Sequence, residues 1–263
     1  MTIQGVAGVR VVVTGSTRGL GLAVAKRLSN GGAHVVVNGT DEDRCRSVAQ
    51  DLGTITVCGR VETSGVAEAL VDTCVAEFGG IDVVVNNAGM TRDAMLTRMT
   101  RDDLREVLAA HIEGTWAVSQ AAVRAMKSGG GGGAIVNVTS GTALFGNTGQ
   151  SNYAAAKGGI LGLTRSLSLE LARFGIDVNA VAPTVKTDMT AGLAEVLTES
   201  GSEISSALGE PDSVATLFEY LCSTASRGMT GQVLSFDGNE LSVWSHPCPT
   251  SSFDMADRGW NIV

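Results

Sequence analysis

Aromatic side chains are scarce in this 263-residue chain: they make up 4% of it, whereas hydrophobic residues make up 44%. Such a composition suits a core of Val, Ala, Leu and Gly around a parallel sheet. Basic residues are also few, because 19 Lys and Arg stand against 27 Asp and Glu, for a formal net charge of −8. The charge balance therefore argues against bulk attraction to nucleic acid or to an anionic membrane.

Patterns for disulfides, metals and membranes are missing as well. An odd number of cysteines without a Cys-x-x-Cys pair favours reduced thiols at Cys45, Cys58, Cys74, Cys222 and Cys248. Nothing completes a ligand set around His246 and Cys248, so we predict no metal site. No apolar run approaches a membrane span and the N-terminus shows no charged-then-apolar signal, so we expect a cytoplasmic protein.

What the chain does contain is an alternation of short apolar strands and helices. Its length suits one α/β domain. We expect strands at 8–14, 33–38, 54–58, 81–85, 134–138 and 177–181, and helices at 20–29, 64–78, 101–126 and 153–174. This alternation predicts a Rossmann-type fold, a doubly wound parallel sheet flanked by helices, with ligands at the carboxyl ends of the strands.

A glycine turn follows the first expected strand. The sequence TGSTRGLG places Gly15, Gly19 and Gly21 between that strand and a helix. In this context a glycine turn brings backbone N–H groups and a helix N-terminus toward a pyrophosphate. The chain therefore predicts a dinucleotide site here.

The end of the second expected strand bears on the choice of cofactor. An NAD-specific site normally places a carboxylate there for the ribose 2′-hydroxyl, but this chain has Gly39. Arg18, within the glycine turn, could instead face a 2′-phosphate. We therefore expect a preference for NADP(H), while the acidic residues that follow at 41–43 keep NAD(H) possible.

Ser140, Tyr153 and Lys157 carry the expected chemistry. Tyr153 and Lys157 are four positions apart at the start of a helix, so both point into the same space. A cation one turn away is expected to lower the pKa of a phenol toward the working range. Ser140, at a strand end, could bond the oxygen of a carbonyl substrate and hold it for Tyr153. The three residues predict protonation of an alkoxide while a hydride arrives from elsewhere.

With these pieces placed, the chain resembles the short-chain dehydrogenase/reductase family. The matching elements are TGSTRGLG, NNAG at Asn86 to Gly89, Ser140, Tyr153, Lys157, and Pro183 followed by Thr187-Asp188-Met189. Within the family, NNAGMTRDAMLTRM, GNTGQSNYAAAKGGI and TGQVLSFDG are most similar to bacterial 3-oxoacyl-acyl-carrier-protein reductases. The resemblance assigns residues 1–238 to the dinucleotide-binding and catalytic domain and leaves 239–263 as an atypical C-terminal extension.

The resemblance also implies site roles. Tyr153 would be the general acid/base, Ser140 would position the carbonyl, and Lys157 would bond the nicotinamide ribose and lower the pKa of Tyr153. Asn86 and Gly89 would line the adenosine side. The residues expected to contact the cofactor are Gly15, Thr17, Arg18, Gly19, Leu20, Gly21, Gly39, Thr40, Arg60, Val61, Asn87, Ala88, Gly89, Tyr153, Lys157, Pro183, Val185 and Thr187.

Four departures from the family pattern stand out. Arg60 replaces an Asp that bonds the adenine, and either contacts the cofactor or marks a weakened site. His111 stands where the family has an Asn in a proton relay, and is either a catalytic proton carrier or a packed core residue. Thr184 follows Pro183 in place of Gly. The extension carries Trp244, Phe253 and Trp260, so we expect it to pack, across a subunit boundary or over a substrate pocket.

The substrate side is less defined. The segment 184–210 is expected to form a lid, lined by Met189, Leu193, Val196 and Leu197, with contributions from Met90, Leu96 and Phe145. Lys127 and Arg173 are the nearest basic residues for docking an acyl carrier protein, which leaves a CoA thioester or a free ketone as alternatives.

Two classes of function follow. The first is an oxidoreductase that interconverts a ketone and a secondary alcohol, with reduction of a 3-oxoacyl thioester preferred over oxidation of a hydroxyacyl-CoA or hydroxysteroid. The second is a non-catalytic subunit of a heteromer with a related chain, suggested by Arg60, His111 and Thr184 but opposed by the intact Ser140, Tyr153 and Lys157. By resemblance a homotetramer is the expected assembly, with a dimer next, through the helices at 101–126 and 153–174.

Overall fold

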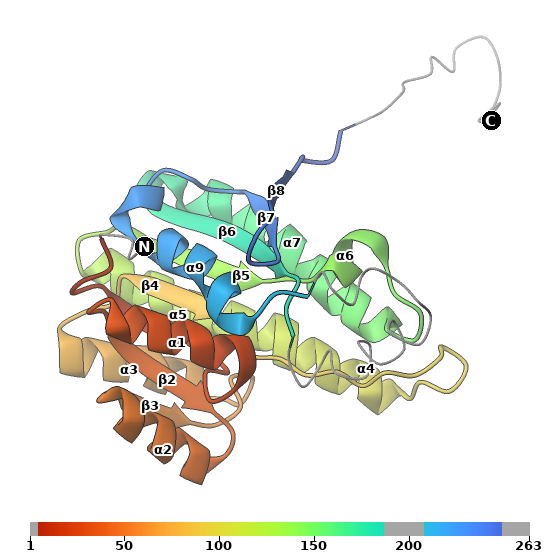
Figure 1. The fold of residues 1–263 in the computed structure, drawn as a ribbon, viewed down its shortest axis with the longest axis horizontal. Helices are drawn as coiled ribbons and strands as arrows, with labels where there is room; N and C mark the ends of the chain where they lie inside the picture. The colour runs from red at the N-terminus through yellow and green to blue at the C-terminus, as the bar shows by residue number, and fades with distance from the viewer. Residues whose placement is uncertain (1–4, 187–207, 249–263) are drawn as a thin grey trace.

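The computed structural model describes residues 5–186 and 208–248 as one eight-stranded sheet with helices on both faces (Figure 1). The strands are β1 (Arg10–Val13), β2 (His34–Gly39), β3 (Ile55–Cys58), β4 (Val83–Asn86), β5 (Gly133–Val138), β6 (Ile176–Pro183), β7 (Val233–Phe236) and β8 (Leu241–Trp244). They lie in the order β3-β2-β1-β4-β5-β6-β7-β8, and β1 to β7 run parallel. The predicted doubly wound α/β fold is confirmed.

Helices divide between the two faces of this sheet. The helical segments are α1 (Gly19–Asn30), α2 (Glu42–Leu52), α3 (Val66–Phe78), α4 (Arg101–Leu108), η1 (Ala109–Glu113), α5 (Gly114–Ser128), α6 (Gly141–Phe145), α7 (Ser151–Leu171), η2 (Ala172–Phe174), α9 (Pro211–Cys222) and η4 (Thr224–Ser226). Val11 and Val13 of β1 pack with α1, α2 and α9, whereas Val12 packs with α3 and α5. Burial on both faces explains why β1 reads as a continuous apolar run.

Two helical predictions were incomplete. The segment 101–126 was expected to be a single helix, but it consists of α4, the π-helical turn η1 and α5, which are continuous in the chain. No helix was predicted between β2 and β3, where α2 forms. Its sequence, EDRCRSVAQDL, buries only Cys45, Val48 and Ala49, so its apolar face is too narrow to stand out.

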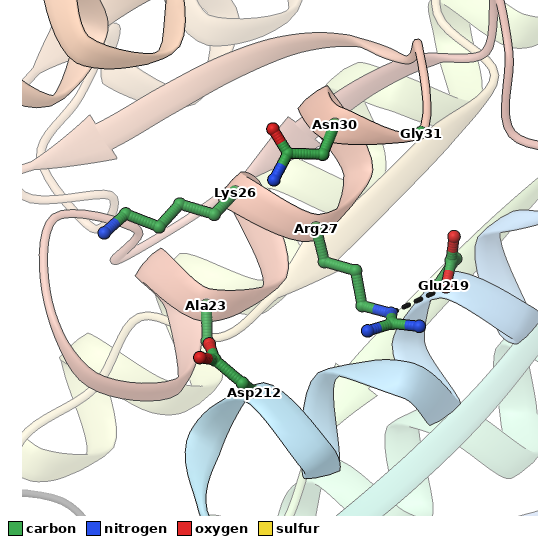
Figure 2. Close-up of a pocket in the computed structure, with 7 residues that line it drawn as sticks. All are labelled: Ala23, Lys26, Arg27, Asn30, Gly31, Asp212 and Glu219. Atoms are coloured by element: carbon green, nitrogen blue, oxygen red, sulfur yellow. Dashed lines mark hydrogen bonds and ion pairs between the residues drawn. The ribbon is translucent and has the colours of Figure 1, made fainter. Parts of the chain in front are cut away.

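An ion pair ties α1 to α9 on one face of the sheet. Arg27 of α1 reaches Glu219 of α9, with 2.6 Å between Nε and Oε2, beside a surface pocket that the two helices share (Figure 2). Glu219 is only 1% exposed, so loss of Arg27 would leave a buried carboxylate poorly compensated. The pair thus helps to hold the helix that follows the glycine turn.

The beginning of the C-terminal extension joins the sheet. β8 pairs antiparallel with β7, from Phe236 opposite Leu241 to Val233 opposite Trp244. Thr187, most of the expected lid (187–207), Phe253 and Trp260 lie outside the described residues. Within the described part of the chain, no helix is long and apolar enough to cross a membrane and no group of three His, Cys, Asp or Glu side chains could hold a metal ion.

Candidate active site

The glycine turn lies between β1 and α1 and is held from two sides. Gly15 and Gly19 have φ values of 62° and 52°, which favour glycine. The Gly15 N–H donates to Asn38 Oδ1 at 3.2 Å. A Cβ at Gly21 would overlap the Gly15 carbonyl oxygen and the Asn87 side-chain amide. The close packing therefore requires glycine at position 21, and α1 begins within the turn at Gly19.

Thr14 and Asn87 connect this turn to the end of β4. Thr14 Oγ1 accepts the backbone N–H groups of Asn87 and Ala88, each at 3.0 Å. The Asn87 side chain donates to the carbonyl oxygens of Thr14 and Gly15, also at 3.0 Å. Asn87 was predicted to contact the cofactor. In the structure its side-chain amide holds the backbone of the glycine turn, so contact with the cofactor stays a prediction. Thr14 was not predicted; its only sequence signal is its position as the first residue of TGSTRGLG.

The end of β2 has no room for a carboxylate. A Cβ added at Gly39 would lie 2.6 Å from Thr17 Cγ2 and 3.2 Å from Cys45 Sγ. The neighbouring Thr40 is exposed, as is Arg18 on the turn. An acidic side chain in place of Gly39, as an NAD-specific site would use, therefore does not fit without rearrangement.

Arg60 and Val61 follow β3 at the same edge of the sheet. Arg60 Nε forms an ion pair with Glu62 Oε1 at 2.6 Å, and its Nη2 lies 3.7 Å from Met90 Sδ. Val61 is buried in the core on the α3–α5 side. The positive charge of Arg60 is thus partly neutralised by the neighbouring Glu62 carboxylate.

The end of β6 closes the other side of the site. Pro183 is the last residue of β6, and the Thr184 N–H donates to the Phe236 carbonyl oxygen at 3.0 Å. Val185 is buried and forms a β-bridge with Gly209. Thr184, which replaces the family's glycine, is therefore tied to β7 through its backbone.

Four side chains from three parts of the chain come together at the strand ends. We call them the catalytic cluster: Ser140, Tyr153, Lys157 and His111. Ser140 caps α6, and its Oγ accepts the Thr142 N–H at 3.2 Å; the same hydroxyl is near enough to Tyr153 to lower the pKa of the phenol. Lys157 is 3% exposed and its Nζ donates to the Val138 carbonyl oxygen at 2.7 Å. The same Nζ lies 5.7 Å from the centre of the Tyr153 ring. The i, i+4 spacing has placed both side chains in one space, as predicted.

The pKa values in this cluster differ from the sequence-based expectation. Burial raises the pKa of Tyr153 above its ordinary value, and the Ser140 hydroxyl lowers it only in part. Burial also lowers the pKa of Lys157 to about 7. Burial therefore dominates both groups and weakens the cationic state of Lys157, and the lowering of the Tyr153 pKa by Lys157 stays a prediction.

His111 packs against the edge of Tyr153 from the π-helical turn η1. The two ring centres are 5.3 Å apart at an interplanar angle of 79°. His111 Nε2 faces both the Met90 carbonyl oxygen, at 2.8 Å, and the Met90 N–H, at 3.2 Å. Burial lowers the pKa of His111 to about 3, so the ring is neutral near pH 7. Among the described residues its Nδ1 has no hydrogen-bond partner.

Asn152, next to Tyr153, was not predicted. It is 1% exposed, and its Nδ2 donates to the Arg92 carbonyl oxygen at 2.8 Å while its Oδ1 accepts the Tyr153 N–H at 2.8 Å. The side chain therefore fixes the start of α7 to the segment after β4. The sequence shows an Asn beside the expected catalytic Tyr, but its burial and its contact with Arg92 are visible only in the structure.

All the described candidate residues lie on segments that follow, or pack against, the carboxyl ends of β1 to β6. The turn after β1 provides a cradle of backbone at the same edge of the sheet as the catalytic cluster, whose residues lie after β5, on α7 and on η1. Buried hydroxyl, ammonium and imidazole groups at one strand end suit proton transfer to a polar substrate beside a bound dinucleotide.

Comparisons with known proteins agree with this arrangement. The family model described as "Enoyl-(Acyl carrier protein) reductase" matches residues 15–238. The 3-oxoacyl-[acyl-carrier-protein] reductases of Chlamydia muridarum and Aquifex aeolicus are 40% and 38% identical to this chain, each over 86% of it and 95% of their own length. A crystal structure of a short chain dehydrogenase from Mycobacterium avium covers 97% of this chain and 91% of its own, with 32% identity and a TM-score of 0.83. The chain therefore belongs to the short-chain dehydrogenase/reductase family of oxidoreductases.

Proposed function

We propose that this oxidoreductase uses NADP(H) to reduce the ketone of a 3-oxoacyl thioester to a secondary alcohol. The observation that carries the proposal is the meeting of the Ser140 and Tyr153 hydroxyl groups beside the buried Lys157, at the strand ends that face the glycine turn. Two hydroxyl groups that lie this near to each other can both reach a single carbonyl oxygen. The similar 3-oxoacyl-[acyl-carrier-protein] reductases support the same substrate class.

In the proposed reaction, this chain's residues handle the oxygen and its proton. The nicotinamide, when bound, supplies the hydride. Ser140 donates a hydrogen bond that holds the carbonyl oxygen, and Tyr153 gives its proton to that oxygen as it becomes an alcohol. A raised pKa keeps Tyr153 protonated near pH 7, which suits a proton donor in the reductive direction. Lys157, fixed by the Val138 carbonyl, would bond the ribose of the cofactor.

The residues present fit a dinucleotide, and NADP(H) better than NAD(H). The close-packed turn at Gly15 and Gly21 leaves backbone, not side chains, at the N-terminus of α1. At the adenosine end, Gly39 has no space for a carboxylate, while Arg18 is exposed on the turn and has the charge for a 2′-phosphate. We place Thr17, Leu20, Thr40 and the backbone of Val61, Ala88 and Gly89 around the nucleotide.

We propose that His111 acts in the catalytic cluster as a neutral hydrogen-bonding group. Because Nε2 faces both a carbonyl oxygen and an N–H group of Met90, either neutral tautomer has a partner there. Nδ1 can then accept or donate a hydrogen bond without loss of the bond to Met90, and this buried atom has no partner among the described residues. The backbone groups of Met90 neither supply nor take up protons, so the ring orients a polar neighbour at Nδ1 and does not pass protons from one nitrogen to the other.

The carrier of the acyl group is open to a direct test. Lys127 and Arg173, the expected docking residues, both contact the Phe174 ring, with Lys127 Nζ 4.1 Å from its centre. This cluster precedes β5 and β6, so within one chain it lies at the opposite edge of the sheet from Tyr153. Docking of a carrier protein at these residues would therefore need a second chain to bring them near a site.

The test compares cofactors and substrates in one assay. We expect the pure protein to oxidise NADPH at least ~10-fold faster than NADH with acetoacetyl-CoA or an acetoacetyl carrier protein. A trans-2-enoyl-CoA serves as the control, because a Ser–Tyr pair aimed at a ketone oxygen predicts little turnover of a carbon–carbon double bond. Turnover of the enoyl thioester alone would contradict the proposal. Binding of NADPH without turnover of any ketone, together with copurification of a related chain, would support the non-catalytic subunit instead.

We also propose a cytoplasmic homotetramer, with a dimer as the next choice. Trp116 of α5 and Leu169 of α7 are 51% and 82% exposed, and a groove between these helices lies beside them. No described atom lies within 4 Å of a Cβ added at Gly162, so α7 presents a small-residue surface for a second copy. Light scattering after size exclusion tests this: Gly162→Glu should convert tetramers or dimers to smaller species, and a monomeric parent would contradict it.

A further inference from the structure

The C-terminal extension reaches the helix that carries Ser140. β8 begins at Leu241, shortly after the end of β7, and adds an antiparallel edge strand to it. At the end of β8, Trp244 Nε1 donates to Ser235 Oγ on β7 at 3.0 Å. The indole is thereby anchored to the sheet through both its backbone and its side chain.

The turn between β7 and β8 is closed by one carboxylate. The N–H groups of Asn239 and Glu240 both donate to Asp237 Oδ1 at 2.7 Å. The Asp237 N–H also donates to the Glu240 carbonyl oxygen, at 3.4 Å. This closed turn sets the direction in which β8 leaves β7, and so helps to place Trp244.

Trp244 contacts α6 directly. Its ring lies 5.1 Å from that of Phe145, centre to centre, at an interplanar angle of 70°. Ala143 and Leu144 of α6 and Trp244 pack against the same buried cluster of Leu161, Ala180 and Val233. The extension and α6 therefore share one small apolar layer at the edge of the sheet.

α6 needs such support because it is short and poorly buried. It has five residues, none of them buried, and it ends at Gly146 with a φ of 78°. A helix of this length is not stable by itself and depends on tertiary packing. Ser140 is its cap, so a shift of α6 moves the hydroxyl that lies near Tyr153.

We propose that Trp244 is a positioning residue, which holds α6 and thereby fixes Ser140 against Tyr153. The claim that this affects turnover rests on the proposed function, but the claim that Trp244 orders α6 does not. The extension thus contributes to the site without touching the substrate, through the contact of Trp244 with Phe145.

Hydrogen exchange tests the structural half of this proposal on the full chain. In Trp244→Ala we expect faster exchange at the amides of Thr142, Ala143 and Gly146, which are hydrogen-bonded in the parent, and unchanged exchange in α1 and α3. Val243→Ala is the matched control, since Val243 is the neighbouring residue of β8 and is 63% exposed. Trp244→Phe should restore most of the protection.

Kinetics and a tyrosine titration test the functional half. We expect Trp244→Ala to lower kcat about tenfold with an unchanged KM for NADPH, because a small displacement of a positioning group mainly affects the chemical step. In a Tyr220→Phe background, where Tyr153 is the remaining tyrosine, its pKa should rise in Trp244→Ala, because the Ser140 hydroxyl that lowers this pKa moves away. Unchanged exchange in α6 and an unchanged pKa of Tyr153 would overturn the proposal. An inactive parent with faster α6 exchange in Trp244→Ala would overturn the proposed function alone.

Discussion

The glycine turn and the catalytic cluster both contain buried polar groups, but they differ in how those groups are satisfied. In the turn, Thr14, Asn38 and Asn87 are bonded to backbone groups, and a Cβ added at Gly21 would overlap the Gly15 carbonyl oxygen and the Asn87 amide. In the cluster, Lys157 Nζ has three donors and bonds the Val138 carbonyl with one of them, and His111 Nδ1 has no partner within the described chain. The hydrogen-bonding groups of the turn are used within the protein, whereas the catalytic cluster keeps hydrogen-bonding capacity for ligands.

This difference separates binding from chemistry. In the turn all the polar groups named above are already hydrogen-bonded, so a mutation there should distort the backbone and weaken cofactor affinity. In the catalytic cluster some donors are unused, so a mutation there should remove a reacting group and slow turnover while the cofactor still binds. Variants in the two regions can therefore be told apart by measuring affinity and turnover together.

The largest effect is expected from Tyr153→Phe. Loss of the hydroxyl removes the proton donor, so kcat should fall by about 10³-fold or more. NADPH affinity, measured by fluorescence titration, should stay within about twofold, because the scaffold is intact. Turnover close to that of the parent would remove Tyr153 from the role assigned to it.

Gly21→Ala should have the opposite effect and weaken NADPH binding more than it slows turnover. The new Cβ would overlap the Gly15 carbonyl oxygen and the Asn87 amide, and overpacking of this kind costs about 1–3 kcal/mol. We expect NADPH affinity to fall about tenfold or more by the same titration. Gly129→Ala is the matched control, since a Cβ at that position would meet no described neighbour closer than 3.5 Å, which is ordinary contact. Equal affinity in Gly21→Ala and the parent would show that the turn is not the cofactor scaffold.

Lys157 should make the stability of the protein depend on pH. Its folded-state pKa of about 7 lies below the ordinary value of 10.5, so above pH 7 the unfolded chain binds more protons than the folded one. The free energy of unfolding should therefore rise from pH 7 to pH 9, by about 1.4 kcal/mol per pH unit at most. Urea unfolding of the parent and Lys157→Met checks this, and a parallel pH dependence in the two proteins would contradict it.

Arg60→Ala should have the smallest effect. The Arg60 side chain is 50% exposed and its partner Glu62 is 12% exposed, so its loss removes a partly exposed ion pair and no group known to bind the cofactor. We expect NADPH affinity to change by less than about threefold. A loss of tenfold or more in the same titration would show that Arg60 leaves Glu62 and contacts the cofactor.

The sequence was sufficient for features set by local pattern. Strand–helix alternation predicted the doubly wound sheet, and the spacing of Tyr153 and Lys157 predicted that they share a face. Features set by tertiary packing were not predictable in this way. Asn152 and Thr14 act through segments far away in sequence, and the direction of the Tyr153 pKa shift depends on burial that the helix spacing does not show.

Transfer of deuterium from cofactor to product tests the central claim most directly. NADPH carrying deuterium at both C4 positions is incubated with the protein and acetoacetyl-CoA, and the product is examined by mass spectrometry. The account predicts a 3-hydroxybutanoyl thioester with one deuterium on the carbinol carbon, and none formed by Tyr153→Phe at a comparable rate. A product without deuterium, or no reduced product while NADPH binds, would contradict it.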